Sequence, residues 1–517
     1  MSKINISFND KNFEIDESVL ASASTDLKQH LSTVMNGSGA TIKFGGTEYS
    51  IDSVKLSTAT NEFVSHLRTI AGEGEKITIG GIEFPIASTL IQNSLSDLCD
   101  HYTDLNNSSM AIPDSIEDLI GKYEFAYFST FVNAVSAVNA GDISGYDADR
   151  ETAIAGVYVD ADRYHVVLLE DTAIEATIKP TVDMTINLGG HTLSSAVGTA
   201  FTINSGNIHF DARLAGSGIN VKTPAGVNAR AIAINSAAKV SIEGGILSAE
   251  GVGTTTPAIL CLGTLNANNT TIIAKSATAR TDGISLSTGA SATINNCNIS
   301  AHSAEGTANG VYVSKNCVVT ITDSTMIGYS NYTHNGTSYT SSSMGVYQAA
   351  GSTLTLNNCT VRGTIAGMQT YGTLFVNGGT YEGYGHGGFY FTGSSAVAYV
   401  RNATIRECAF NEGYTTNNGT NEVGFYIGGG SNNSVYMDNC TIESAGHAIV
   451  LRTTSGEQNN TLYISNSNIG ENQQIRIDST THKLYLGVGN NFTAEDTTLP
   501  AAVIETDETY VYNEMAV

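Results

Sequence analysis

The sequence predicts a mainly β protein, most of it a β-solenoid whose short strands wind into stacked coils. Three observations support this fold. Between residues 240 and 470 a short phrase recurs every 20 to 37 residues, as in Asn295-Asn-Cys-Asn-Ile299 and Asp438-Asn-Cys-Thr-Ile442. A second phrase, Gly-x-Tyr, falls between these repeats, for example at Gly310 and Gly345. The segments carrying both phrases alternate polar and apolar residues like strands, and no helical pattern interrupts them.

Aligning the repeats on their apolar anchor reveals a column that is almost entirely Asn or Asp. This structural ladder comprises Asn269, Asn296, Asp323, Asn358, Asn402, Asn439 and Asn466. Asn and Asp tolerate the left-handed backbone of a sharp bend, and stacked amides can hydrogen-bond from coil to coil. The next column is small and includes Cys297 and Cys359. These cysteines lie two coils apart, about 9.6 Å, which is too far for a disulfide, so we expect them to fill the core.

These columns resemble the right-handed parallel β-helix of phage tailspikes and pectate-lyase-like proteins. The stacking follows from the columns, whereas the right-handed winding is what the resemblance implies. The predicted β-helix covers residues 151–492 in about ten coils. Residues 493–517, which contain the alternating run Thr509-Tyr-Val-Tyr-Asn, are expected to form a C-terminal cap strand or tail.

The first 106 residues form a different repeat. The segment Ile6–Asp16 returns at Ile42–Asp52 and Ile77–Ala87, each time as a hairpin with Asn-Asp or Gly-Gly at the turn. Amphipathic helical segments follow the hairpins. The pattern predicts three tandem ββα units, at about 1–37, 38–73 and 74–106. They resemble N-terminal repeats in virion proteins of gut bacteriophages, which implies that residues 1–106 attach the chain to other virion proteins.

Residues 107–150 are expected to join the two parts as a linker and a capping helix. The helix-prone stretch begins at Pro113 and continues to about Asn139. A helix at this point would cover the core and the edge that the first coil of a β-solenoid otherwise exposes.

Composition and charge exclude several classes of partner. The net charge of −25 argues against nucleic acid. No apolar run reaches the roughly 18 residues of a membrane span, so we expect no membrane insertion. The start of the chain shows no signal peptide, which predicts synthesis in a host bacterial cytoplasm. The spacing of Cys and His residues predicts no metal and no cofactor, and His30, His66 and His101 are best explained as copies that came with the repeat.

Two coils are unusually long, after Met326 and after Ile405, and both insertions fall at the same corner. Three coils separate them, about 14 Å, so together they would wall a groove. The candidate glycan-binding residues at this corner are Tyr332, His334, Asn335, Tyr339, Tyr384, His386 and Tyr414. Aromatic faces stack on sugar rings and amides match sugar hydroxyls. The alternative is that these are ordinary loop residues.

A glycosidase would need two carboxyl groups across the bond it cleaves. If the protein is an enzyme, the candidate catalytic residues at this corner are Glu382, Glu407, Glu412 and Glu422. However, Glu382 also belongs to an outward column with Arg362, Arg406 and Glu443 on successive coils. Alternating charges predict an exposed ion-pair ladder, which gives Glu382 a structural role and leaves no assigned catalytic residue.

Three hypotheses follow. The first is a bacteriophage virion structural protein (a head fibre, capsid decoration protein or tail-associated adhesin) that lies on the virion surface and binds host-surface polysaccharide. The second is a tailspike-like depolymerase, a glycoside hydrolase or lyase, on the same architecture. The third is a bacterial surface adhesin, which the lack of a signal peptide disfavours. The resemblance also implies a homo-oligomer, such as a trimer.

Overall fold

The chain forms two units, residues 1–113 with 516–517, and residues 114–515. The computed structural model describes residues 3–8, 11–16, 41–44, 47–50, 75–79, 82–86, 120–252, 255–330, 343–383, 387–407, 423–444, 447–452, 456, 458–469, 474–492 and 503–510.

The first unit contains three antiparallel hairpins. Strand β1 (Lys3–Phe8) pairs with β2 (Lys11–Asp16), β3 (Thr41–Phe44) with β4 (Thr47–Ser50), and β5 (Glu75–Ile79) with β6 (Ile82–Ile86). The helical segments predicted to complete the three ββα units lie outside the described residues, so these units stay a prediction.

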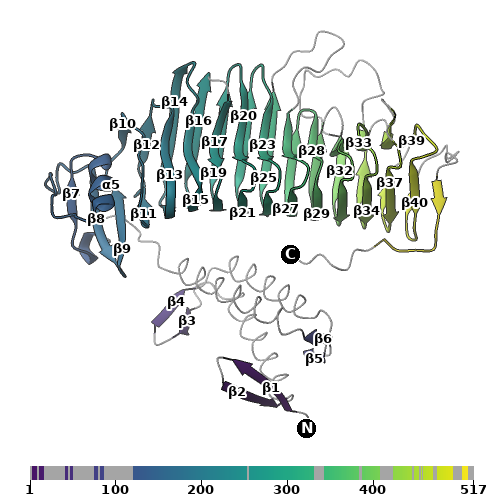
Figure 1. Ribbon diagram of the computed structural model, residues 1–517, viewed down its shortest axis with the longest axis horizontal. Coiled ribbons are helices and arrows are strands. Elements are labelled where there is room, and N and C mark those ends of the chain that lie inside the picture. Colours follow the sequence, from purple (N-terminus) through teal and green to yellow (C-terminus); the bar gives the residue numbers. More distant parts are fainter. Residues whose placement is uncertain are drawn as a thin grey trace. The chain divides into compact units, whose positions relative to one another are not determined.

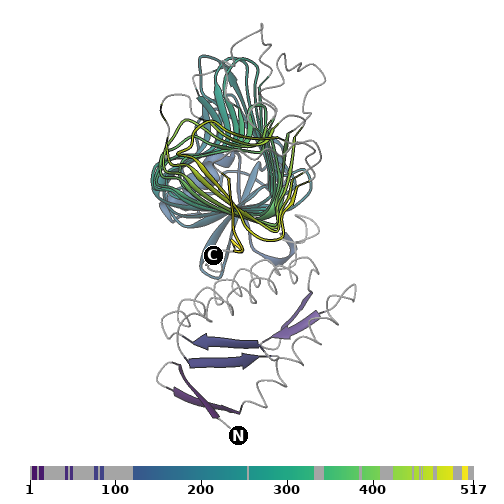
Figure 2. The ribbon, with the colours of Figure 1, turned by 90° about the vertical axis from the view of Figure 1, so that its right-hand side faces the viewer.

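The second unit is a parallel β-solenoid whose coils stack along one axis (Figure 1). Its strands fall on three faces, as the view along the stack shows (Figure 2). Sheet A comprises β9 (Arg163–Leu168), β11 (Met184–Asn187), β18 (Thr264–Asn268), β21 (Ser291–Asn295), β24 (Val318–Thr322), β31 (Val397–Arg401), β34 (Ser434–Asp438), β37 (Thr461–Ser465), β40 (Lys483–Leu486) and β42 (Val503–Glu505).

Sheet B follows sheet A in each coil. It comprises β10 (Thr172–Ile174), β12 (Thr192–Ser195), β14 (Gly218–Ala225), β16 (Ile246–Val252), β19 (Thr271–Ser276), β22 (Asn298–Ser303), β25 (Thr325–Ser330), β32 (Thr404–Glu407), β35 (Thr441–Glu443), β38 (Asn468–Ile469) and β41 (Asn491–Phe492). Sheet C comprises β17 (Thr255–Cys261), β20 (Arg280–Leu286), β23 (Ala308–Val313), β26 (Met344–Gln348), β28 (Ala366–Thr370), β30 (Phe389–Phe391), β33 (Val423–Ile427), β36 (His447–Leu451) and β39 (Gln474–Ile477).

Four long strands turn a corner without a break. Strands β13 (Thr199–Ala212) and β15 (Arg230–Gly244) continue from sheet C into sheet A, and β27 (Thr353–Gly363) and β29 (Thr373–Gly383) continue from sheet A into sheet B. Each strand pairs in parallel with the strand of the same face in the next coil, which confirms the predicted solenoid.

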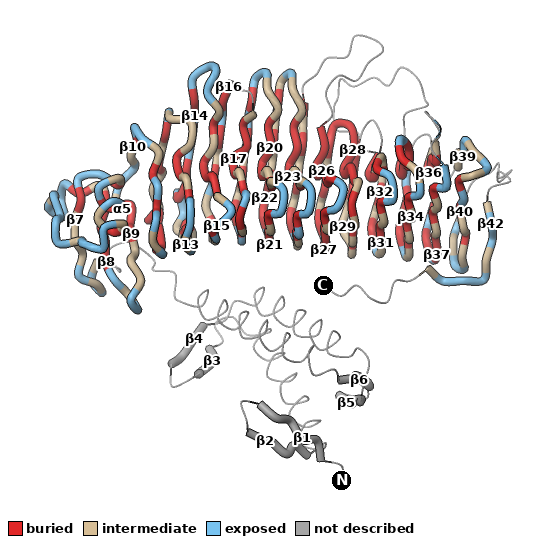
Figure 3. Tube along the Cα trace, in the orientation of Figure 1, coloured by how far each residue is buried: buried red, intermediate tan, exposed pale blue. Residues whose placement is uncertain are grey.

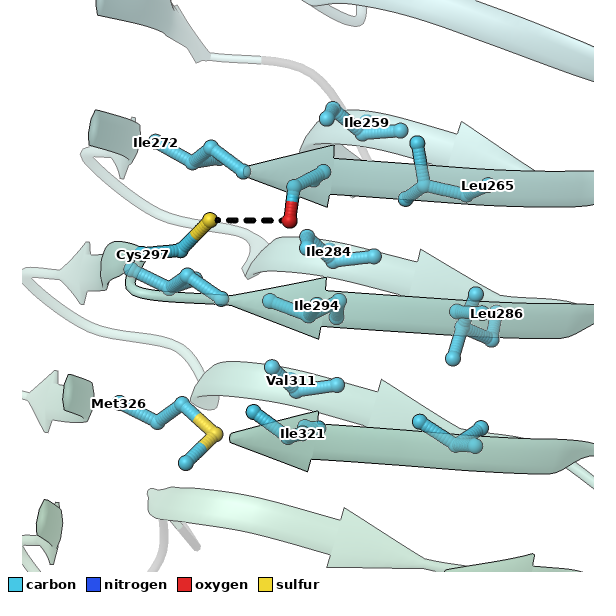
Figure 4. Close-up of a cluster of buried hydrophobic side chains, with 14 of the residues drawn as sticks. Ile259, Leu265, Ile272, Ile284, Leu286, Ile294, Cys297, Val311, Ile321 and Met326 are labelled. Atoms are coloured by element: carbon cyan, nitrogen blue, oxygen red, sulfur yellow. Dashed lines mark hydrogen bonds between the residues drawn. The ribbon is translucent and has the colours of Figure 1, made fainter. Parts of the chain in front are cut away.

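Buried residues recur along the strands of every coil (Figure 3), and their side chains form columns of like residues inside the solenoid (Figure 4). In sheet B, Ile272, Ile299 and Met326 follow one another in register, and all three are fully buried. Cys297 is buried beside them, and its thiol lies 3.4 Å from the carbonyl oxygen of Ala267 (Figure 4). Cys297 and Cys359 are free and buried, as the sequence predicts.

The bend between sheets A and B uses the Asn ladder. All seven ladder residues have positive φ, between 47° and 57°. The amide of Asn296 donates to Asn269 over 2.6 Å, and the amide of Asn439 donates to Asn402 over 2.8 Å. Asn therefore serves twice, because it accepts the left-handed backbone and links successive coils.

The N-terminal end of the solenoid departs from the predicted long helix. The stretch 113–139 is not one helix, because β7 (Ala126–Phe128) pairs antiparallel with β8 (Ala155–Asp160), and β8 pairs with β9. The helix α5 begins only at Phe131 and ends at Ala140, with Thr130 capping its start and Gly141 in the left-handed conformation at its end. Aromatic residues favour strands, and here pairing with β8 outweighs the helical pattern.

Helix α5 nevertheless covers the end of the core. Its buried face includes Phe131 and Val135, which belong to the main hydrophobic cluster. The ring of Phe131 meets Phe201 edge to face, with centroids 6.3 Å apart. At the other end the last described strand is β42, which pairs with β40. Most of the alternating run at 509–513 lies outside the described residues.

Candidate functional site

The insertions leave sheet B at aligned positions. Gly328 of β25 pairs in register with Gly363 of β27, Gly363 with Gly383 of β29, and Gly383 with Glu407 of β32. The sheet B strands thus end at aligned positions in successive coils. From these strand ends the chain continues to the next sheet C strand through residues 331–342, 384–386 and 408–422. Strands β25 and β32 are three coils apart, about 14 Å.

The side chains predicted to bind glycan lie outside the described residues. These are Tyr332, His334, Asn335, Tyr339, Tyr384, His386 and Tyr414, together with the carboxylate candidates Glu412 and Glu422. Glu407 is described only as the last residue of β32. Their roles stay predictions. Among the candidates, Glu382 alone has a described side chain.

Glu382 lies at the centre of an ion-pair ladder on sheet B. Arg362, Glu382, Arg406 and Glu443 stand in register on four successive coils, as predicted. One carboxylate oxygen of Glu382 accepts from Nε of Arg362, and the other accepts from Nε of Arg406 over 2.6 Å. Both oxygens are therefore committed to guanidinium groups.

The prediction that this column is exposed is wrong at Glu382. Its side chain is only 4% exposed, whereas those of Arg362 and Arg406 are 40% and 43% exposed. The arginines stand on either side of the carboxylate, so the ladder is partly buried at its middle. Because both of its oxygens already accept hydrogen bonds from arginines, Glu382 is poorly placed to donate a proton to a substrate as a general acid.

The outer face of sheet C carries a column of tyrosines beside this corner. Tyr312 pairs in register with Tyr347, and two coils further on Tyr390 pairs with Tyr426. The rings of Tyr312 and Tyr347 stack in parallel, 4.9 Å apart and 6° from coplanar, whereas Tyr390 and Tyr426 meet edge to face at 5.1 Å. The tyrosines of this column are those of the Gly-x-Tyr phrase. Aligning the copies of this phrase could therefore have predicted the column, whereas the alternation of polar and apolar residues could not.

An amide interrupts the tyrosine column. Gln369 stands in register between Tyr347 and Tyr390. Its Nε2 donates to the hydroxyl oxygen of Tyr371 and to Oγ1 of Thr392, each over 2.9 Å. Burial raises the pKa of Tyr347 and of Tyr390 to about 12, so both hydroxyls keep their protons at neutral pH and can donate hydrogen bonds.

At the Tyr312 end of the column, an arginine covers the ring and is paired with a buried carboxylate. The guanidinium of Arg280 lies 3.7 Å from the centroid of the Tyr312 ring and donates to Asp282 over 2.9 Å. Asp282 also accepts from the amide of Asn309 over 2.7 Å. Burial raises the pKa of Asp282, with Arg280 and Asn309 opposing the rise. Asp282 is fully buried, so a substrate cannot reach it. Its hydrogen bond with Arg280 orients the guanidinium group.

Two further properties of the described part of the chain bear on chemistry. Within it, no three His, Cys, Asp or Glu side chains gather in a way that could hold a metal ion. Its helices include none long and apolar enough to cross a membrane. What the corner does offer is aromatic rings, amides, hydroxyls and paired arginines.

The comparisons with known proteins add little to this picture. No protein-family model matches the chain, and no curated protein matches it. Among solved structures, the catalytic domain of a GH87 alpha-1,3-glucanase in complex with tetrasaccharides matches with 11% sequence identity and a TM-score of 0.21. The match covers 64% of this chain and 66% of the glucanase chain, just under two thirds. Such a match does not bear on activity, and what the chain itself shows is a parallel β-solenoid.

Proposed function

We propose that this protein is a bacteriophage virion component that projects its β-helix from the particle and binds a host-surface polysaccharide. It would act as a head fibre, a capsid decoration protein or a tail-associated adhesin, as a homo-oligomer. Support for the attachment role comes from the repeats within residues 1–106, whose hairpins recur at β1–β2, β3–β4 and β5–β6. Their resemblance to virion repeats supports an attachment role for this module.

One observation carries the glycan-binding part of the proposal. Three segments connect the aligned ends of sheet B strands to sheet C strands. Each of those sheet C strands has a tyrosine as its outward residue. Residues 331–342 lead to Tyr347, residues 384–386 to Tyr390, and residues 408–422 to Tyr426. In the chain, the tyrosines of this column therefore follow directly on segments whose sequences are rich in Tyr, Asn and His. Rings and amides together are what sugar recognition requires.

Binding is favoured over cleavage because Glu382 is committed to Arg362 and Arg406. The depolymerase alternative must rely on Glu407, Glu412 and Glu422. The bacterial adhesin alternative predicts a cell-surface location, and mass spectrometry of purified virions decides between it and the virion assignment. Absence of this chain from virions, with its presence in the bacterial envelope, would reverse the assignment.

The binding test uses the full-length chain and polysaccharide purified from the host surface. Isothermal titration should show binding by wild type, and Tyr390→Ala should weaken it about fivefold or more, because stacking on one aromatic ring contributes about 1–3 kcal/mol. Tyr146→Ala is the matched control, since Tyr146 is 65% exposed in the N-terminal cap, several coils along the stack from β30. If wild type and both variants bind the polysaccharide with equal affinity, Tyr390 on sheet C does not contribute to binding.

A further inference from the structure

The outer face of sheet A contains a block without charged side chains. In β18, β21, β24 and the sheet A parts of β27 and β29, the outward residues are all Thr, Ser, Asn, Val or Phe. Thr293 and Asn266 are exposed, and Val318 is 61% exposed. Five consecutive coils thus present a surface of uncharged side chains, most of them short.

A ladder of aromatic rings continues this face toward the C-terminal end. Phe375 stacks on Tyr399, Tyr399 on Tyr436, Tyr436 on Tyr463 and Tyr463 on Tyr485. Successive ring centroids are 4.6 to 5.5 Å apart, with interplanar angles of 12° or less. Because the ring faces cover each other, the ladder presents its ring edges to the outside as far as β34. At β37 the chain's own Tyr510 covers the face: its ring lies 5.1 Å from that of Tyr463, and its backbone N–H donates to Oγ of Ser465 over 2.9 Å. Along β31, β34 and β37 only Arg401 and Asp438 add charge on this face.

This neutrality is unusual for the chain as a whole, whose net charge is −25. The outer faces of the other sheets do carry charges, such as Lys222 paired with Glu250 on sheet B and Arg280 on sheet C. Two copies of so acidic a chain repel each other, except where the approaching surfaces are uncharged. Depletion of charged residues and enrichment of tyrosine are also what distinguishes the centre of protein interfaces from other surface.

The size of the face fits an interface between copies. Seven strands from β18 to β34 at about 4.8 Å spacing, each about 16 Å long, give a flat area of about 540 Å². A stable interface of standard size buries about 800 Å² on each partner, counted over its side-chain relief. The face is therefore of the extent that a pair of copies needs.

We propose that the outer face of sheet A, from β18 to β34, is the contact surface between copies of this chain. This inference is independent of glycan binding, which the proposed function places on sheet C. The resemblance to tailspikes implies an oligomer, but it is the charge distribution that selects the face.

The test introduces charge at the centre of this face in the full-length chain. Thr293→Glu combined with Thr373→Glu adds two negative charges to sheet A, and Ser300→Glu combined with Thr360→Glu adds two to sheet B as the matched control. Light scattering at equal concentrations should give an oligomeric mass for wild type and for the control, and a monomeric mass for the sheet A variant. Circular dichroism and the melting temperature verify that each variant folds.

A complementary pair keeps the test informative if the double variant folds poorly. Thr293→Lys and Thr293→Glu should each associate more weakly than wild type, and an equal mixture of the two should recover the oligomeric mass. A monomeric wild type at tens of micromolar, or a sheet A variant with the wild-type mass, would overturn the proposal. Loss of polysaccharide binding by the sheet A variant with its mass unchanged would also overturn it, by assigning the face to glycan.

Discussion

Arg406 and Glu382 face each other across neighbouring coils, with Nε of Arg406 2.6 Å from Oε1 of Glu382. The other oxygen of Glu382 accepts from Arg362, one coil away on the opposite side. Three side chains from three stacked strands thus form one partly buried ion-pair cluster next to the edge from which the insertions leave sheet B. The cluster links the side chains of three successive coils on the outer surface of sheet B.

Glu382→Gln should destabilise the solenoid. The substitution keeps the size of the side chain but leaves two guanidinium groups beside an uncharged amide. Hydrogen bonds to charged groups contribute about 1.5–3 kcal/mol, and the partial exposure of both arginines reduces the loss, so we expect about 1–2 kcal/mol. Chemical denaturation measures the change. Glu443→Gln is the control, because Glu443 stands in the same column but is exposed; equal effects would mean that burial of Glu382 contributes nothing.

Asn439 should be sensitive in two separable ways. Its φ is 50°, and its amide donates to Asn402 over 2.8 Å. Asn439→Ala loses the hydrogen bond and strains the backbone, and should cost about 1–2 kcal/mol of unfolding free energy. Asn439→Gly loses the hydrogen bond but accepts positive φ, so its cost should be smaller. An alanine variant at least as stable as the glycine variant would argue against the backbone role.

Stability should fall as the pH is lowered from about 6.5 to 4. Burial lowers the pKa of His165 and of His209 to about 4, against about 6.5 in the unfolded chain. His165 stacks on Tyr158 at 4.6 Å, and Nδ1 of His209 lies 2.8 Å from Oγ of Ser241. Between these two pH values the unfolded chain binds more protons than the folded chain, so protonation favours unfolding. The loss ends near pH 4, where both states are protonated.

His209→Gln tests this pH dependence. Glutamine can retain a hydrogen bond to Ser241 but cannot be protonated in this range. Denaturation midpoints measured at pH 7, 5.5 and 4 should decline less steeply for the variant than for wild type, with the difference equivalent to at most about 3 kcal/mol. Parallel curves for the two proteins would show that His209 does not contribute.

The repeat structure could be predicted because each coil places the same residue in the same backbone conformation. The Asn ladder marks the bend between sheets A and B, since few residues accept positive φ there. Aligning on the anchors also gives the register of Arg362, Glu382, Arg406 and Glu443 correctly. Local conformation and spacing suffice for these features.

Other features depend on contacts that spacing does not contain. The burial of Glu382 follows from how two long arginine side chains lie against it, which a column of letters leaves open. The strand at Ala126–Phe128 forms because β8 offers it a partner, whereas the local pattern favours helix. The tyrosines of sheet C meet in one column because of the Gly-x-Tyr phrase. The phrase does not tell whether their rings stack, as Tyr312 and Tyr347 do, or meet edge to face, as Tyr390 and Tyr426 do.

The last prediction separates binding from catalysis at the corner. If the protein only binds polysaccharide, the wild-type chain should release no reducing ends from the host polysaccharide during prolonged incubation. A depolymerase would release them, and the carboxylates available for cleavage are Glu407, Glu412 and Glu422, because Glu382 is held by two arginines. Glu412→Gln or Glu422→Gln should then abolish release while leaving affinity in titration largely intact.

Tyr384→Ala combined with Tyr414→Ala should instead weaken host-cell binding with the melting temperature nearly unchanged, since surface substitutions usually alter stability by less than about 0.5 kcal/mol. Release of reducing ends by wild type would replace the adhesin by an enzyme, whereas unchanged cell binding by the double tyrosine variant with no release would leave the insertions without either role.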